Sequence, residues 1–244
     1  MAGFKDKRIW IIGASAGIGA ALARAFAAEG ARLILSARDA AALEAMAADC
    51  GGAEVIALDL GQRETLAAAV AGLAPGTLDA VICTAALYDP ARVADLDPVR
   101  CEDLVRVNLL GSLDVARLTP PLLRDGGQLV LFGSVAGYIG LPGGQAYSAT
   151  KAAVNNLAET LRIELAPRLD VRLVCPGFVR SRLTAMNDFP MPAMIEPEEA
   201  AAAVLAGLRG RAFEIHFPKR FTLAMKLLRA LPYALSLRLT GRLG

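Results

Sequence analysis

The chain has 244 residues, of which 55% are hydrophobic, and its formal net charge at pH 7 is +2. The hydrophobic share excludes a disordered chain, and the near-balanced charge gives no electrostatic case for binding nucleic acid. Only one histidine and four well-separated cysteines are present, without a C-x-x-C pair, so we expect no metal site and free thiols in a reducing compartment.

The two ends of the chain differ in character. Residues 1–8 lead directly into a strand-like run and lack the features of a signal peptide. The longest segment without a charge, residues 126–150, contains seven glycines and Pro142, which excludes a transmembrane helix there. We therefore expect a cytoplasmic protein with a single domain over residues 1–218 and a cationic tail over residues 219–244.

Short β-branched runs alternate with alanine-rich helical segments along the chain. Strands are predicted at 8–12, 32–36, 54–58, 78–83, 128–132 and 171–175. Helices are predicted at 17–29, 39–49, 62–73, 101–123, 146–166 and 197–208. This alternation predicts an α/β protein of the Rossmann type, a doubly wound parallel sheet flanked by helices on both faces. Ligands of such sheets bind beyond the carboxyl ends of the strands.

The first predicted strand runs into "GASAGIG", where Gly13, Gly17 and Gly19 precede a helix. Glycines at these positions allow a tight turn and let backbone amides approach an anion at the helix N-terminus. Simple close packing is the alternative explanation of such a turn. The strand before it and the helix after it favour a dinucleotide cofactor.

The second predicted strand ends in "LSARD", with Ala37 where an NAD-binding chain would carry a carboxylate. The planar fork of Arg38 suits a 2′-phosphate, so we expect NADP(H) rather than NAD(H), although NAD(H) stays open. The alternative is a surface arginine paired with Asp39. Asp59, which ends the third strand, is placed either to accept a hydrogen bond from an adenine amino group or to cap a helix.

The fifth predicted strand ends near Ser134, and Tyr147 and Lys151 follow on one helix. Residues four apart share a helical face, so both side chains can reach one site. Lys151 is the only lysine between Arg8 and Pro218 in an arginine-rich chain. A nearby cation lowers the pKa of a tyrosine from its usual ~10 towards the range in which it exchanges protons. An ordinary surface pair of Tyr147 and Lys151 is the alternative.

Together with Asn108 in "VNLLGS" and "CPGFV" at 175–179, these motifs resemble those of the single-domain short-chain dehydrogenase/reductase family over residues 7–210. The resemblance implies an NAD(P)-dependent oxidoreductase acting on CH–OH or C=O groups. It makes Tyr147 the general acid/base and Ser134 a donor to the substrate oxygen.

The same resemblance assigns the remaining roles. Lys151 would lower the Tyr147 pKa and bind the nicotinamide ribose, and Asn108 would hold a water that links Lys151 to solvent. The implied cofactor contacts are Gly13, Ser15, Ala16, Gly17, Ile18, Gly19, Arg38, Asp59, Leu60, Thr84, Ala85, Ala86, Asn108, Tyr147, Lys151, Pro176, Gly177, Val179 and Ser181.

Two positions depart from the family pattern. Ile12 stands where the family usually has threonine, and Thr84-Ala85-Ala86 stands where it usually has Asn-Ala-Gly. Those two sites meet on neighbouring strands in the family. We expect the paired change to be compensated, because losing both the donor and the amide avoids a buried unpaired group.

The segment of about residues 178–200 is where the family carries a variable substrate lid. The methionines make this segment apolar and adaptable, which predicts an apolar ketone, aldehyde or secondary alcohol as substrate. Alternatively, these side chains only fill a small core of the lid's own. The predicted substrate contacts are Ser134, Tyr138, Leu141, Tyr147, Met186, Phe189, Met191 and Met194.

The function predicted is an NADPH-preferring carbonyl reductase or alcohol dehydrogenase. The alternative is a non-catalytic nucleotide-sensing or membrane-recruited binding protein on the same fold. A homo-oligomer is expected, a dimer or a tetramer.

Residues 215–244 contain no acidic residue but six basic ones, including Arg242, and predict a cationic amphipathic helix over 220–231 that Pro232 ends. Such a helix can lie on a membrane surface, roof the substrate pocket or contact another subunit.

Overall fold

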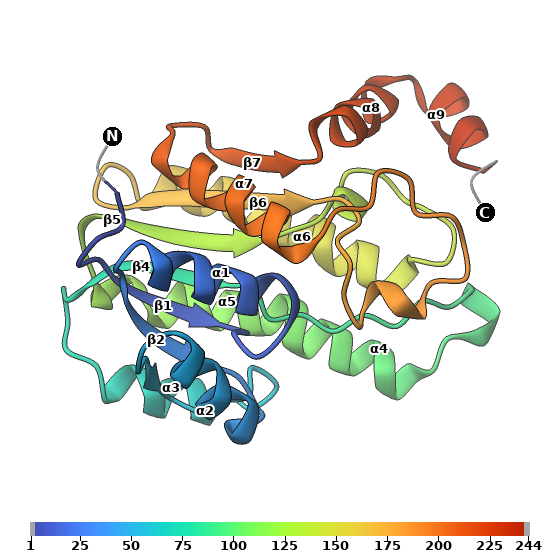
Figure 1. Cartoon of the computed structure of the whole chain (residues 1–244). Coiled ribbons are helices and arrows are strands. Elements are labelled where there is room, and N and C mark those ends of the chain that lie inside the picture. Colours follow the sequence, from blue (N-terminus) through green and yellow to red (C-terminus); the bar gives the residue numbers. More distant parts are fainter. Residues whose placement is uncertain (1–2, 242–244) are drawn as a thin grey trace.

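The computed structural model describes residues 3–241. Its centre is a seven-stranded parallel sheet in the order β3-β2-β1-β4-β5-β6-β7 (Figure 1). This confirms the predicted Rossmann-type fold. The strands are β1 (Arg8–Ile12), β2 (Arg32–Ser36), β3 (Glu54–Val55), β4 (Leu78–Cys83), β5 (Leu123–Phe132), β6 (Asp170–Pro176) and β7 (Glu214–Phe217).

Helices cover both faces of the sheet because the strands are apolar on both sides. In β1, Ile9 and Ile11 belong to a core cluster with residues of α1, α2 and α7, whereas Trp10 and Ile12 pack with α3, α5 and α6. The helices are α1 (Gly17–Ala28), α2 (Ala40–Asp49), α3 (Arg63–Ala71), α4 (Pro98–Leu104), α5 (Gly111–Leu118), α6 (Gln145–Glu164), α7 (Pro197–Arg209), α8 (Lys219–Ala230) and α9 (Tyr233–Thr240).

The segment predicted as one helix over 101–123 is divided. It begins earlier, at Pro98, where the Asp97 side chain caps α4 by accepting from the Val99 amide at 2.9 Å. A π-helical turn over Val105–Leu110 separates α4 from α5. Two further differences are a third strand of only two residues and the edge strand β7, which was not predicted.

The tail forms two helices, α8 and α9, separated by Pro232 (Figure 1). The predicted helix over 220–231 therefore exists within one residue at each end, and α9 was not predicted. Arg242 lies outside the described residues, as do Met1 and Ala2. Among the helices of residues 3–241, none combines the length and the apolar composition needed to cross a bilayer.

Candidate active site

The turn between β1 and α1 accepts only glycine at two positions. Gly13 has φ +98°, and a Cβ there would lie 2.6 Å from the Ala85 amide nitrogen. At Gly19 a Cβ would lie 2.0 Å from the Gly13 carbonyl oxygen. Helix α1 then starts without a side-chain cap on Ala16 and without an acidic residue in its first turn. The result is a helix N-terminus whose first amides can meet an anion, which fits a cofactor pyrophosphate.

The departures at positions 12 and 84 are compensated as predicted. The Thr84 hydroxyl lies 3.1 Å from the carbonyl oxygens of both Ile12 and Gly13, and its single proton is shared between them. Ile12 is buried in the apolar core. The Thr84 hydroxyl thus bonds backbone carbonyls at the end of β1, and positions 12 and 84 carry no side-chain amide that would need a partner.

Arg38 is exposed at the carboxyl end of β2. The alternative prediction, that it pairs with Asp39, is wrong: the Asp39 carboxylate instead caps α2 by accepting from the Ala42 amide at 3.0 Å. Within the described part of the chain no hydrogen bond or ion pair engages the Arg38 guanidinium. Its planar group is therefore free for a ligand at the strand end where the cofactor adenosine would lie.

Asp59 closes a turn after β3. Its Oδ1 accepts from the Gly61 amide at 2.8 Å, and the residue that precedes α3 is Gln62, so the helix-cap alternative for Asp59 is wrong. Leu60 is buried beside Gly111. Asp59 remains partly exposed at the sheet edge, where the adenine contact was predicted.

Three predicted catalytic residues surround the carboxyl end of β5. Ser134 begins a short 3-10 turn, Val135–Gly137, and its Oγ accepts from the Ala136 amide at 3.1 Å, which leaves the hydroxyl proton free to donate. The Lys151 ammonium donates to the Phe132 carbonyl at 2.7 Å and lies 5.8 Å from the centre of the Tyr147 ring. Only 3% of Lys151 is exposed, so a charge is held inside the protein.

Burial controls the protonation of this group. It raises the pKa of Tyr147 to about 12, although a hydrogen bond with Ser134 acts in the opposite direction. Burial also lowers the pKa of Lys151 to about 8. Desolvation is the main cause of the raised Tyr147 pKa. The role of Lys151 in lowering that pKa stays a prediction.

Asn108 lies in the π-helical turn and is fully buried. Its side chain accepts from the Leu87 amide at 2.7 Å and donates to the Leu87 carbonyl at 2.9 Å and to Thr150 Oγ1 at 3.2 Å. It therefore joins the segment after β4 to α6. The predicted role of Asn108 in holding a water for Lys151 stays a prediction.

Tyr88, which lies beside Tyr147, and its partner Asn187 are absent from the predicted substrate contacts. The Tyr88 ring packs edge-on against the Tyr147 ring, with centroids 4.8 Å apart, and its hydroxyl donates to Asn187. Tyr88 follows the Thr84-Ala85-Ala86 segment at the end of β4, so its place in the sequence gave a signal. Nothing in the sequence pointed to Asn187.

Asn155 was also missed. It is buried on α6 one turn after Lys151, and its side-chain nitrogen lies 3.5 Å from the Ser134 carbonyl. Its side-chain oxygen accepts from the Cys175 thiol at 3.5 Å. The spacing of Tyr147, Lys151 and Asn155, four residues apart each time, could have revealed one polar stripe on α6.

The segment after β6 reaches across to the glycine turn. Gly177 donates its amide to the Phe217 carbonyl at 2.7 Å, directly after Pro176. Val179 is buried and pairs with Ile195 in a β-bridge. Ser181 and Thr184 bond each other, and a Cβ at Gly17 would lie 3.7 Å from that of Ser181. The predicted cofactor residues from three strand ends are thereby gathered at one edge.

The β-bridge between Val179 and Ile195 joins the two ends of the predicted lid. None of residues 180–199 is buried, so the alternative that this segment fills its own core is wrong. Phe189 packs against Phe178 with ring centres 6.0 Å apart, and the Met191 sulfur accepts from Asn187. The other predicted substrate residues do not all have contacts of this kind: Met186 is exposed, and Leu141 and Met194 are partly exposed.

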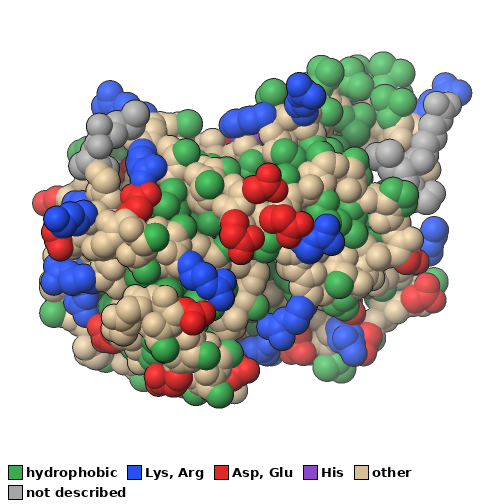
Figure 2. Space-filling view, viewed as in Figure 1, with side chains coloured by type: hydrophobic (Ala, Val, Ile, Leu, Met, Phe, Trp, Pro, Cys, Tyr) green, Lys and Arg blue, Asp and Glu red, His purple; other side chains and the backbone are tan. Residues whose placement is uncertain are grey.

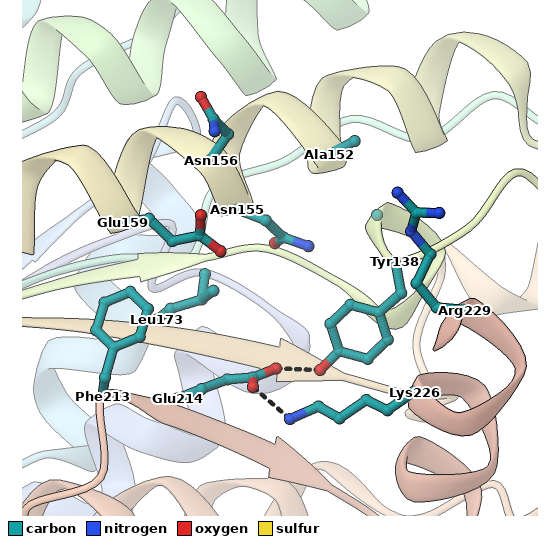
Figure 3. Close-up of a pocket in the computed structure, with 11 residues that line it drawn as sticks. Tyr138, Ala152, Asn155, Asn156, Glu159, Leu173, Phe213, Glu214, Lys226 and Arg229 are labelled. Atoms are coloured by element: carbon teal, nitrogen blue, oxygen red, sulfur yellow. Dashed lines mark hydrogen bonds and ion pairs between the residues drawn. The ribbon is translucent and has the colours of Figure 1, made fainter. Parts of the chain in front are cut away.

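Tyr138 points away from this site. Its hydroxyl donates to Glu214 on β7, and Glu214 also accepts from Lys226 on α8 (Figure 3). These residues line a cavity of about 420 Å³ bounded by α6, β7 and α8, whose lining does not include Ser134, Tyr147 or Lys151. The placement of Tyr138 among the substrate contacts is contradicted, because Glu214, a half-buried acceptor on the edge strand, orients the phenol towards the tail.

A sequence profile of the short chain dehydrogenase family matches residues 7–189. The chain belongs to this family. It is thus a short-chain dehydrogenase/reductase and an oxidoreductase.

Other short-chain dehydrogenases are similar along nearly the whole chain. An uncharacterized oxidoreductase of Myxococcus xanthus is 32% identical over 243 residues, which are 95% of each chain. A short chain dehydrogenase from Burkholderia cenocepacia, solved with NADP, is 28% identical, with a TM-score of 0.86 over 98% of this chain and 99% of that one. One from Sphingobium yanoikuyae, solved with NADPH, is 28% identical, with a TM-score of 0.79 over 93% and 97%.

Proposed function

We propose that this protein is an NADPH-preferring carbonyl reductase or alcohol dehydrogenase that moves a hydride between the nicotinamide and an apolar ketone, aldehyde or secondary alcohol. The observation that carries the proposal is the group of Ser134, Tyr147 and Lys151 at the carboxyl end of β5, where the phenol of Tyr147 lies beside a buried ammonium. Strongly perturbed side chains at such a strand end are typical of catalytic sites.

The residues present fit a dinucleotide. The uncapped N-terminus of α1 would hold the pyrophosphate, and Asp59 would contact the adenine. The free guanidinium of Arg38 favours a 2′-phosphate, and the similar Burkholderia and Sphingobium proteins were solved with NADP and NADPH. When bound, the nicotinamide supplies or accepts the hydride.

Tyr147 would act as the acid on the substrate oxygen. Its raised pKa keeps the phenol protonated at neutral pH, so a proton is ready when a carbonyl oxygen gains negative charge. Ser134 would donate a second hydrogen bond to the same oxygen, since its Oγ already accepts from the Ala136 amide. In the opposite direction Tyr147 must first lose that proton, so its protonation favours carbonyl reduction.

Lys151 and Asn108 would assist the proton transfer from Tyr147 without contacting the substrate oxygen. One Lys151 N–H is bound to the Phe132 carbonyl, which fixes the ammonium and leaves two donors for ribose hydroxyls. Asn108 would act as a positioning residue, because its bonds to Leu87 and Thr150 hold α6 against the segment after β4.

The lid supports an apolar substrate. Phe189 and the three methionines at 186, 191 and 194 supply adaptable apolar surface near Tyr88. Arg180 is ion-paired with Glu196 at 2.7 Å and so does not stand free to receive an acidic substrate. We expect neutral, lipophilic carbonyl compounds to bind better than phosphorylated or acidic ones.

The test is turnover of purified protein with NADPH and with NADH across a panel of aliphatic, aromatic and polycyclic ketones. We expect NADPH oxidation to match ketone loss one for one, with apolar ketones turned over best. Tight NADPH binding without turnover of any ketone, aldehyde or alcohol would instead support the non-catalytic nucleotide-sensing alternative. Equal turnover of acidic and apolar ketones would contradict the assigned substrate class.

A further inference from the structure

The polar face of α8 is turned towards the protein. Thr222 is 0% exposed, and its hydroxyl lies 2.6 Å from Nδ1 of His216 on β7. The Lys226 ammonium is bound to Glu214 and lies 5.7 Å from the centre of the Tyr138 ring, as Figure 3 shows. These contacts fix the rotation of the helix, so its opposite face must point outward.

That outward face is apolar. Leu227 is 67% exposed and Leu223 55%, and Tyr233 on α9 is 63% exposed. In Figure 2 hydrophobic side chains gather over α8 and α9 with basic side chains beside them. Contiguous exposed apolar surface of this kind marks contact with a partner or a membrane. We call this the tail surface, formed by Leu223, Leu227, Tyr233, Leu235, Leu237 and Leu239.

The charged side chains of the tail itself all have one sign. Within the described tail, residues 218–241, there is no acidic side chain, while Lys219, Arg220, Arg229 and Arg238 are exposed. Arg229 lies 5.5 Å from the centre of the Tyr233 ring and donates to its hydroxyl at 3.2 Å. Leucines flanked by arginine, lysine and an amphipathic tyrosine are the composition of segments that lie at a membrane–water interface.

The charge pattern decides between two occupants. In a symmetric contact with a second copy, the same patch meets itself, so the basic side chains of both copies would be brought together without an acidic partner in the tail. An anionic lipid surface instead supplies apolar depth for the leucines and negative charge for the basic residues. We propose that the tail surface docks the protein onto the surface of an anionic bilayer, with α8 and α9 lying in the interface.

This docking would place the substrate lid near the lipid. Phe221, at the start of α8, packs against Phe178 with ring centres 5.5 Å apart, and Phe178 packs against Phe189 of the lid. The tail thus contacts the loop that carries Gly177 on one side and exposes leucines on the other. The proposal does not depend on the enzymatic activity, because binding to lipid is measured without turnover.

The experiment is co-sedimentation of the full chain with vesicles of phosphatidylcholine alone or with one third phosphatidylglycerol. We expect binding to the anionic vesicles, with roughly a fivefold loss of affinity for each basic tail residue replaced by glutamine, in Arg220→Gln and Arg238→Gln. Leu223→Ser with Leu227→Ser should reduce binding roughly tenfold or more. The matched control is Val99→Ser, an exposed apolar residue on α4, which should bind like the wild type.

Light scattering measures the mass of each variant in solution and so separates membrane docking from a subunit interface at the tail surface. Because the serine variants alter exposed side chains, circular dichroism should match the wild type. Equal binding to neutral and anionic vesicles would overturn the charge argument. If the protein binds no vesicle, the proposal is wrong. If the serine pair dissociates an oligomer that Val99→Ser leaves intact, the tail surface is a subunit interface, and the proposal is wrong in that case too.

Discussion

Helix α6 and the tail both depart from the rule that charged side chains are exposed and apolar side chains are buried, and they do so in opposite ways. On α6 the lysine at position 151 is buried, whereas on α8 and α9 the leucines of the tail surface are exposed. A buried charge and an exposed apolar patch are each informative, since scattered exposed apolar residues are ordinary. Both arrangements cost stability, so each indicates a place where the chain meets something other than itself.

The apolar cores of the fold offset the loss of stability that both arrangements cause. Two core clusters, one on each face of the sheet, hold the strands together with α1 to α3 and α5 to α7. The comparison shows that α6 holds Lys151 in a surrounding of low dielectric constant, whereas polar contacts hold α8 so that its leucines are exposed. Each of the following changes tests one side of this comparison.

The largest stability effect should separate the two faces of α8. Met225 is buried and Leu227, two residues later, is exposed. We expect Met225→Ala to lower the free energy of unfolding by about 2–4 kcal/mol, because it leaves a cavity, and Leu227→Ala to change it by less than about 0.5 kcal/mol. Urea denaturation measures both. Equal losses would mean that Leu227 is covered by protein in solution.

A smaller effect tests the buried charge on α6. Burial lowers the pKa of Lys151 to about 8 in the folded protein from its ordinary value of 10.5, so between these pH values the unfolded chain binds more protons and stability rises with pH. Below pH 8 the penalty for burying the charge is fully present. We therefore expect Lys151→Met to be more stable than the wild type by ~1–3 kcal/mol at pH 7.

That advantage should disappear as the pH rises past 10.5, the ordinary pKa of lysine, because the side chain is then neutral in both states. The readout is the difference in urea midpoint between Lys151→Met and the wild type at several pH values, which cancels the titration of other groups. A difference that does not change with pH would show that Lys151 is not desolvated.

The smallest effect concerns Arg38, an exposed charge of an ordinary kind. If it binds the 2′-phosphate, Arg38→Ala should weaken NADPH about tenfold, near the lower limit for a hydrogen bond between charged groups, and leave NADH unchanged. Fluorescence titration of both cofactors measures this. Arg32→Ala, another exposed arginine at the opposite end of β2, is the control. Parallel losses of NADPH and NADH would refute the cofactor preference.

Much of the sheet could be predicted from the sequence because its signals are local. The apolar runs of β4 and β6 predict buried strands, and Gly13 and Gly19 lie at positions where only glycine fits. The edge strand β7 could not be predicted, since "EIHF" is short and half polar. The division of the 101–123 helix depends on Asn108 bonding to Leu87, a contact between distant segments.

The sequence could predict which residues form the site, but it could not predict how their side chains are oriented or protonated. Ser134, Tyr147 and Lys151 do surround one strand end, but the protonation of Tyr147 depends on burial, which a sequence pattern does not give. Tyr138 follows the same strand, yet its hydroxyl is drawn to Glu214. Likewise, the inward direction of Thr222 and Lys226 depends on acceptors that β7 supplies.

The most direct test of the account is hydride transfer in a single turnover by Tyr147→Phe, with NADPH and the best ketone of the panel at saturation. The change removes one hydroxyl and keeps the ring that packs against Tyr88. We predict a rate at least ~100-fold below that of the wild type, with the affinity for NADPH within about a factor of two. A Tyr147→Phe protein that transfers hydride at the wild-type rate would contradict the assignment of this site.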